Sequence, residues 1–367
     1  MAKDFVLVTV LINNYNYARY LGAAIESALA QTYRPVEVVV VDDGSVDDSR
    51  SVISGYGDAI LPVYKENGGQ ASAFNVGFAE SRGEIVRFLD ADDVLTHSSV
   101  EEVAEAFCQH PDAGMVQCRV EVADAAGTPL GVFIPPAYVR MPTGDLRLRT
   151  NDLNNASWWA STSGISVAST VLKRVLPLPE DLYPISADHG LALASALCAP
   201  VVSLEMTGAY YRSHGRNSYN RTNIEANRIR DDVRRLVDCQ RYLRQFAERV
   251  GVEDYPEDPY TAPDSLFLIQ RLLAVKLGAA NDRLPGDTLR GVTWKGLSAA
   301  FRRPDVGGMI KLLHVGWFAL VAVLPRPLAR RLANRTLFQQ NRARVSKLVG
   351  KASETARTRR KAKRSAT

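Results

Sequence analysis

Residues 85–93 have the sequence IVRFLDADD, in which a mostly apolar run ends in three carboxylates, Asp90, Asp92 and Asp93. Carboxylates beside a buried strand are costly unless they are paired or bound to a cation. Alternation along a strand end places Asp90 and Asp92 on the same side, and Mg²⁺ typically takes one or two carboxylates plus phosphate and water. The stretch therefore predicts a cation site. The alternative is a strand-to-turn junction whose acids only cap backbone donors.

The sequence before this stretch alternates between strand-like and helix-like patterns. Apolar runs predict four strands, at 5–12, 36–41, 60–64 and 85–89. Helical spacing lies between them at 20–31 and 71–81. This alternation predicts an α/β fold with a mostly parallel central sheet flanked by helices. Ligands of such sheets bind outside the carboxyl ends of the strands, so we expect Asp42 and Asp43 to line one crevice with the acids of residues 90–93.

Composition limits the class of protein. The chain has 367 residues, 46% of them hydrophobic, which is enough for a catalytic domain with additions. Its four cysteines form no CxxC pair, which argues against a zinc site and for a reducing compartment. The N-terminal residues lack the pattern of a signal peptide, so none is expected.

Charge is distributed unevenly along the chain. Residues 326–367 hold fourteen Lys or Arg and one acid, leaving 31 basic and 39 acidic residues in 1–325. An acidic body argues against a nucleic-acid-binding domain, whereas the basic tail suits an anionic surface. No GxGxxG or GxxxxGK[ST] pattern supports a dinucleotide fold or a P-loop. The turn ENGGQ at 66–70, which includes Asn67, either brings backbone amides to a diphosphate or is a plain loop.

Four segments, in this order, resemble family-2 glycosyltransferases, which have the GT-A fold. They are LINNYNYARYLGAAIESALAQTY at 11–33, VVVVDDGSVD at 38–47, ENGGQASAFNVGFAESRGEIVRFLDADD at 66–93 and YYRSHGRNS at 210–218. The resemblance covers roughly residues 5–220 and does not extend to the C-terminal third. It implies a GT-A α/β domain, followed by helical C-terminal additions.

The resemblance also implies roles for individual residues. Asn13 and Asp43, with Asp42 and Asn67 nearby, would bind the nucleotide sugar. Asp90, Ala91 and Asp92 match the DxD motif, which holds the ribose and a divalent cation, Mg²⁺ or Mn²⁺, on the diphosphate. The further residues expected at the metal or the phosphates are Asp93, His214 and Arg212. The alternatives are a structural histidine at 214 and a salt bridge at Arg212.

The base that activates the acceptor is expected at Asp188, in YPISADHGLALASAL at 183–197. Members of the family usually have Glu-Asp here, whereas this chain has Ala187-Asp188. The alternative is that Asp188 only caps the helix that follows. Trp158 and Trp159 are candidates for stacking on an acceptor sugar, and the alternative for both is a place in the core.

The implied activity is inverting transfer of a sugar from a nucleoside diphosphate sugar, with a UDP-sugar favoured. The implied acceptor is a hydroxyl group of a glycan or a lipid-linked saccharide. A second hypothesis is a non-catalytic nucleotide-sugar-binding scaffold within a membrane glycan assembly. A full DADD together with Asp188 favours the enzyme.

We expect four parts: a GT-A domain at 1–220, a helical extension at 221–303, an apolar helix at 304–325 and a basic, partly disordered tail at 326–367. Residues 306–324 are nineteen long, near the ~20 that span a bilayer, but they contain Lys311 and His314. We therefore expect peripheral contact of 304–367 with anionic lipid at the cytoplasmic face of the cell membrane. The alternative is a helix buried against the catalytic domain.

Overall fold

The computed structural model describes residues 6–149, 158–215, 217, 226–255, 265–278 and 283–337. These residues fall into two compact units. The first holds those within Met1–Pro135, Met141–His214 and Arg235–Asp264, and the second holds those within Pro136–Arg140, Gly215–Arg234 and Ser265–Thr367.

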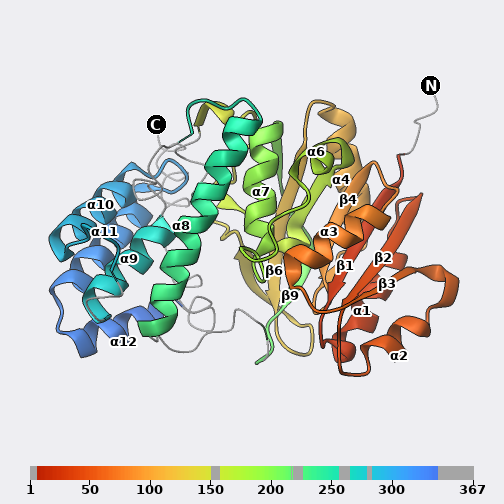
Figure 1. The fold of residues 1–367 in the computed structure, drawn as a ribbon, viewed down its shortest axis with the longest axis horizontal. Helices are drawn as coiled ribbons and strands as arrows, with labels where there is room; N and C mark the ends of the chain where they lie inside the picture. The colour runs from red at the N-terminus through yellow and green to blue at the C-terminus, as the bar shows by residue number, and fades with distance from the viewer. Residues whose placement is uncertain are drawn as a thin grey trace, which may run out of the picture. The chain divides into compact units, whose positions relative to one another are not determined.

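The first unit is built on a nine-stranded sheet with the order β3-β2-β1-β4-β8-β6-β9-β5, and β7 pairs with β6 (Figure 1). The strands are β1 (Val8–Asn14), β2 (Val36–Asp43), β3 (Leu61–Lys65), β4 (Ile85–Asp90), β5 (Val94–Leu95), β6 (Met115–Ala123), β7 (Pro129–Ile134), β8 (Ile165–Ala168) and β9 (Val201–Arg212). The first four predicted strands are present, and β1, β2, β3 and β4 pair in parallel. Antiparallel pairing begins only where β8 joins β4. The parallel pairing of the first four strands confirms the predicted mostly parallel α/β class.

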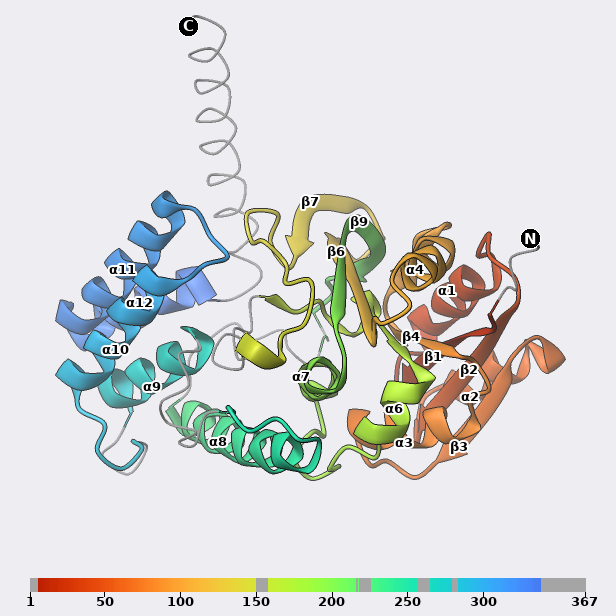
Figure 2. The same cartoon turned by 90° about the horizontal axis from the view of Figure 1, so that it is seen from above.

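Helices cover both faces of this sheet. Those of the first unit are α1 (Ala18–Leu29), α2 (Ser49–Ser54), α3 (Gln70–Glu80), α4 (Ser99–Gln109), α6 (Ser169–Val175) and α7 (Ala187–Cys198), with short 3-10 turns η1 (Gly57–Ala59), η2 (Arg147–Arg149) and η4 (Thr162–Gly164). Figure 2 shows α1 and α4 on one face and α3 and α6 on the other.

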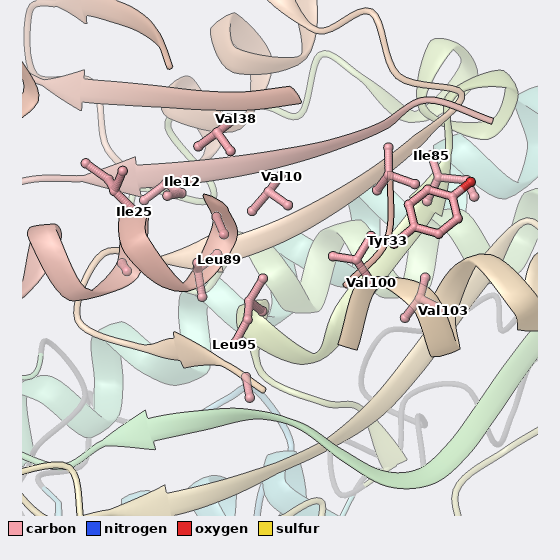
Figure 3. Close-up of a cluster of buried hydrophobic side chains, with 14 of the residues drawn as sticks. Val10, Ile12, Ile25, Tyr33, Val38, Ile85, Leu89, Leu95, Val100 and Val103 are labelled. Carbon is pink, nitrogen blue, oxygen red and sulfur yellow. The ribbon is translucent and has the colours of Figure 1, made fainter. Parts of the chain in front are cut away.

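Alternation along the strands explains how each face of the sheet is filled. Val10 and Ile12 of β1 pack with Ile25 of α1 and Val100 of α4 in the cluster of Figure 3. Leu11 lies between these two residues and faces the opposite side of the sheet, toward α3. A Cβ on Gly77 of α3 would lie 2.8 Å from the Leu11 side chain. Residues 8–12 are apolar except Thr9, which donates to Glu37, because both faces of the strand are buried.

The parallel register aligns the carboxyl ends of the central strands. Asn14 of β1 lies opposite Asp42 of β2, and Asn13 lies opposite Asp90 of β4. The polar residues that end these three strands are therefore neighbours at one edge of the sheet.

The second unit is helical. Its helices are α9 (Ser265–Leu277), α10 (Leu289–Arg302), α11 (Gly308–Val323) and α12 (Arg326–Leu337), while α8 (Ala226–Arg249) begins in this unit and ends in the first. Gly296 lets α10 approach α11 closely, because a Cβ there would lie 2.3 Å from the Phe318 ring. None of the helices in the described part of the chain is long and apolar enough to cross a membrane.

Candidate active site

Two asparagines at the end of β1 hold the acids of the neighbouring strands. Asn13 donates from Nδ2 to Oδ1 of Asp90 at 3.0 Å, and Asn14 donates from Nδ2 to Oδ1 of Asp42 at 3.0 Å. Asp42 is fully buried, and Arg50 also reaches it at 3.3 Å. The sheet register and these amides together fix the positions of both carboxylates.

Asp43 organises the glycine turn after β3. The backbone N–H groups of Gly68 and Gly69 donate to its two oxygens at 3.0 and 2.8 Å, and Lys65 Nζ lies 2.6 Å from Oδ1. Asn67 donates from Nδ2 to the Asp43 carbonyl oxygen at 3.1 Å. In this structure two amides of the turn therefore donate to Asp43 and leave Oδ2 with one further acceptor position.

Asp90, which ends β4, and Asp92 and Asp93, which follow it, lie in a desolvated region and repel one another. Desolvation, and then the negative charges of Asp92 and Asp188, raise the pKa of Asp90 to about 7. Burial followed by the charges of Asp92 and Asp90 raises the pKa of Asp93 well above its ordinary value. Asp93 is fully buried and accepts from Ser163 Oγ at 2.6 Å and from the Arg212 N–H at 3.0 Å.

Strand β5 brings the sequence motif around His214 to these acids. It follows Asp93 directly and pairs with β9, with Val94 opposite Tyr210, so the end of β9 passes beside Asp92. His214 Nε2 lies 3.0 Å from Oδ2 of Asp92. The imidazole stacks on Tyr20 with ring centres 4.4 Å apart, which fixes its plane.

Asp188 lies in the first turn of α7. Its Oδ2 accepts from the Thr162 N–H at 3.1 Å, and its Oδ1 accepts from the His189 N–H at 2.9 Å. Desolvation raises the pKa of Asp188 to about 6 in spite of these donors. The N-cap position belongs to Ser186, which has a left-handed backbone with φ of 60°. Asp188 is therefore not the N-cap that the alternative interpretation requires.

The residues near Asp90 suit a divalent cation. Carboxylate oxygens and an imidazole are ligands for Mg²⁺ or Mn²⁺, and a cation would relieve the repulsion that raises the pKa of Asp90. Among the described residues, no three or more His, Cys, Asp or Glu side chains are arranged as a protein-only metal site.

The two predicted sugar-stacking contacts look different in the structure. Trp158 and Trp159 are 2% and 4% exposed, and Arg149 lies 5.2 Å over the Trp158 ring. Neither indole therefore has a free face for an acceptor sugar, and the core alternative holds. The Arg212 guanidinium also lies 5.1 Å over the Tyr20 ring, a cation–π contact that the sequence did not predict.

The structure adds site residues that the sequence did not reveal. Thr162 and Ser163 belong to η4, which β8 carries to the end of β4 through antiparallel pairing. Gln70, the first residue of α3, donates to Asp90. A polar side chain directly after two glycines at a helix start could have suggested Gln70, but no sequence signal pointed to Thr162 or Ser163.

Comparison with known proteins identifies the class. Residues 9–140 match the model of glycosyl transferase family 2. An uncharacterized glycosyltransferase of Nostoc sp. is 35% identical over 251 residues, which are 66% of this chain and 76% of the relative. An uncharacterized glycosyltransferase of Rickettsia prowazekii is 45% identical over 95 residues, which are 26% of this chain and 30% of the relative.

A solved structure agrees in fold. The crystal structure of S. aureus TarS 1–349 in complex with UDP-GlcNAc matches with a TM-score of 0.50 and 16% identity, covering 86% of this chain and 90% of that one. The chain belongs to glycosyltransferase family 2, and the predicted resemblance is confirmed. It is a glycosyltransferase with a GT-A-like fold.

Replacing Asp93 by Asn should change how stability depends on pH. Because burial raises the pKa of Asp93 in the folded state, the folded protein keeps a proton that the unfolded chain releases above about pH 4. Wild type therefore loses stability as pH rises from about 4 toward the folded pKa, and Asp93→Asn loses less, because only the raised pKa values of Asp90 and Asp188 remain in it. In urea unfolding from pH 4 to 8, the free energy of unfolding of the variant should increase relative to that of wild type as pH rises.

The control is Asp58→Asn, which removes an exposed carboxylate. The free energy of unfolding of this variant should differ from that of wild type by a similar amount at every pH. Parallel pH dependences for wild type and Asp93→Asn would contradict the raised pKa.

Proposed function

We propose that this protein transfers a sugar, with inversion, from a nucleoside diphosphate sugar to a hydroxyl group of a glycan or lipid-linked saccharide. UDP-sugars are the favoured donors. The observation that carries the proposal is that Asp90 and Asp188 lie in one desolvated cluster. They are close enough for the charge of Asp188 to raise the pKa of Asp90. Such a cluster provides a donor side and an acceptor side in one site.

Asp188 is the proposed general base. With a pKa of about 6, its carboxylate is mostly ionised at neutral pH and is more basic than an ordinary aspartate, which suits removal of a proton from a hydroxyl. The N–H groups of Thr162 and His189 hold one oxygen each. Each oxygen keeps an acceptor position that an acceptor hydroxyl can approach.

The donor side is assigned to the ends of β1, β2 and β4. Asn13, Asp43 and Asn67 are proposed to contact the nucleoside, with the buried Asp42 beside them and Ala91 between the two acids of the DxD match. A divalent cation held by Asp90, Asp92 and His214, with Asp93 as a further candidate ligand, would stabilise the charge that develops on the departing diphosphate. TarS, which has a similar fold, was crystallised with UDP-GlcNAc, and this supports the choice of donor.

The experiment that tests this function is a panel of nucleotide sugars assayed for release of the nucleoside diphosphate with Mg²⁺, with Mn²⁺ and with a chelator. Metal-dependent release from a UDP-sugar, increased by a saccharide acceptor, is the expected result. Binding of a nucleotide sugar without any release would favour the non-catalytic scaffold instead.

Asp188→Asn should bind donor normally and lose transfer by about 10²- to 10⁴-fold, because an amide cannot accept the proton. In wild type, kcat/KM should fall below about pH 6 as Asp188 becomes protonated. Transfer rates and donor affinities measured on the same preparations check both statements. The matched control is Asp181→Asn, an exposed acid in the loop before α7. Normal transfer by Asp188→Asn would contradict the assignment of Asp188 as the base.

We also propose that α11 and the basic residues around it contact anionic lipid at the cytoplasmic face of a membrane. The helix is neither wholly buried nor wholly exposed. Ile310, Phe318 and Val321 pack inward. The opposite face is apolar and between 48% and 76% exposed, at Met309, Leu312, Leu313, Leu320 and Val323.

Charge favours a lipid surface as the partner of this face. Residues 289–337 contain nine Lys or Arg and one acid, Asp305, which is buried and paired with Arg303. An apolar helix face with basic residues nearby is the composition of interfacial helices that bind anionic membranes. A membrane-borne acceptor would then be reached by a protein that binds peripherally.

Leu312→Ser combined with Leu313→Ser should weaken binding to phosphatidylglycerol vesicles, because both side chains are more than half exposed and removing them leaves the buried side of α11 intact. Co-sedimentation at low salt measures this, and added salt should weaken wild-type binding. Val46→Ser, at an 89% exposed position of the first unit, is the control. The proposal would be contradicted if wild-type protein did not bind anionic vesicles, or if the double variant bound them as well as wild type does.

A further inference from the structure

The first turn of α3 is fastened to the loop that leads into α7. The backbone N–H groups of Gln70 and Ala71 donate to the carbonyl oxygens of Pro184 and Tyr183 at 2.9 and 3.1 Å. Gly69, with φ of 85°, permits this approach, because a Cβ there would lie 2.7 Å from the Pro184 backbone. N–H groups that a helix start leaves without partners therefore bind the segment that carries Asp188.

The Gln70 side chain makes the same connection through its amide. Nε2 donates to Oδ1 of Asp90 at 3.0 Å and to Oγ1 of Thr162 at 3.1 Å. Oε1 accepts from the Ala187 N–H at 2.9 Å. Both N–H bonds and the carbonyl oxygen are thus used, and they join three separate elements of the first unit.

Two short paths lead from Gln70 to Asp188. Ala187 is the residue before Asp188, so its N–H anchors the start of α7 on Gln70. Thr162 accepts from Gln70 through its hydroxyl and donates from its backbone N–H to Oδ2 of Asp188 at 3.1 Å. Gln70 therefore contacts the DxD aspartate directly and holds the proposed base through one residue on each path.

We propose that Gln70 is a positioning residue that sets the distance and orientation between Asp90 on the donor side and Asp188 on the acceptor side. The inference rests on the proposed glycosyl transfer and deepens it. Displacement with inversion needs the base and the leaving group held on opposite sides of the reacting carbon, and small errors in such geometry reduce rate strongly.

The chemistry of the amide explains why glutamine suits this position. The two carboxylates repel each other, and a lysine or arginine between them would form ion pairs and lower their pKa values. A neutral amide holds both sides without adding charge. Glutamate would keep an acceptor for the Ala187 N–H but offers no N–H for Asp90, and alanine offers neither.

The matched control is Asn75, further along the same helix. Its Nδ2 donates to the Leu178 carbonyl oxygen at 2.9 Å and its Oδ1 accepts from the Leu178 N–H at 2.8 Å. Asn75 thus fastens the same long loop to α3 through the same kind of side chain, but it makes no contact with Asp90 or Ala187 among the hydrogen bonds of the described residues.

The experiment compares Gln70→Ala, Gln70→Glu and Asn75→Ala by hydrogen–deuterium exchange and by steady-state kinetics of the full chain. Gln70→Ala should increase exchange at the Ala187 amide and lower kcat about 10- to 100-fold, with a smaller change in KM for the donor. Gln70→Glu should restore protection at Ala187 but not kcat. Asn75→Ala should increase exchange near Leu178 and keep kcat within about threefold of wild type.

Each outcome decides a separate point. Unchanged exchange at Ala187 in Gln70→Ala would overturn the connection itself. If Gln70→Ala increased exchange at Ala187 but lowered kcat no more than Asn75→Ala does, Gln70 would only stabilise the local structure, and its positioning role would be overturned. Absence of transfer by wild type with every donor would refute the proposed function, and with it the positioning role. The exchange data would then still report on the connection.

Discussion

Electrostatic repulsion among acids gathered at the carboxyl ends of the sheet is the constraint on which the rest of the site depends. Asp90, Asp92 and Asp93 follow one strand, and Asp188 is close enough to raise the pKa of Asp90. Desolvation makes their charges costly in the absence of a partner. The surrounding residues supply hydrogen bonds from Asn13, Gln70, Thr162, Ser163 and His214. These bonds fix each carboxylate while leaving Asp90 and Asp188 with raised pKa values.

The fold provides these partners from distant parts of the chain. Parallel pairing aligns Asn13 with Asp90, antiparallel pairing of β8 with β4 brings η4 to the same edge, and β5 draws in the end of β9. The contributing segments belong to the sheet or are hydrogen-bonded to it, and α7 is joined to it through Gln70 and Thr162. Precise placement of the base and the leaving group is what transfer chemistry requires.

Much of this organisation was predictable from the sequence because the signals are local. Apolar runs that end in Asp42-Asp43 and Asp90 gave the strands and the edge where a ligand binds, and the fold class followed from their alternation with helices. The burial of Trp158 and Trp159 was not predictable, since it depends on packing between segments far apart in sequence. Thr162 and Ser163 were missed for the same reason: their role comes from the pairing of β8 with β4 and not from any pattern around them.

The central claim is that the DxD acids bind a cation together with the donor diphosphate. Isothermal titration calorimetry of UDP with and without Mn²⁺, on wild type and on Asp92→Asn, tests it most directly. Mn²⁺ should tighten UDP binding to wild type at least about tenfold, in the range of ordinary coupling between two ligands, and Asp92→Asn should lose most of this gain. Equal UDP affinity with and without Mn²⁺ in wild type would contradict the account.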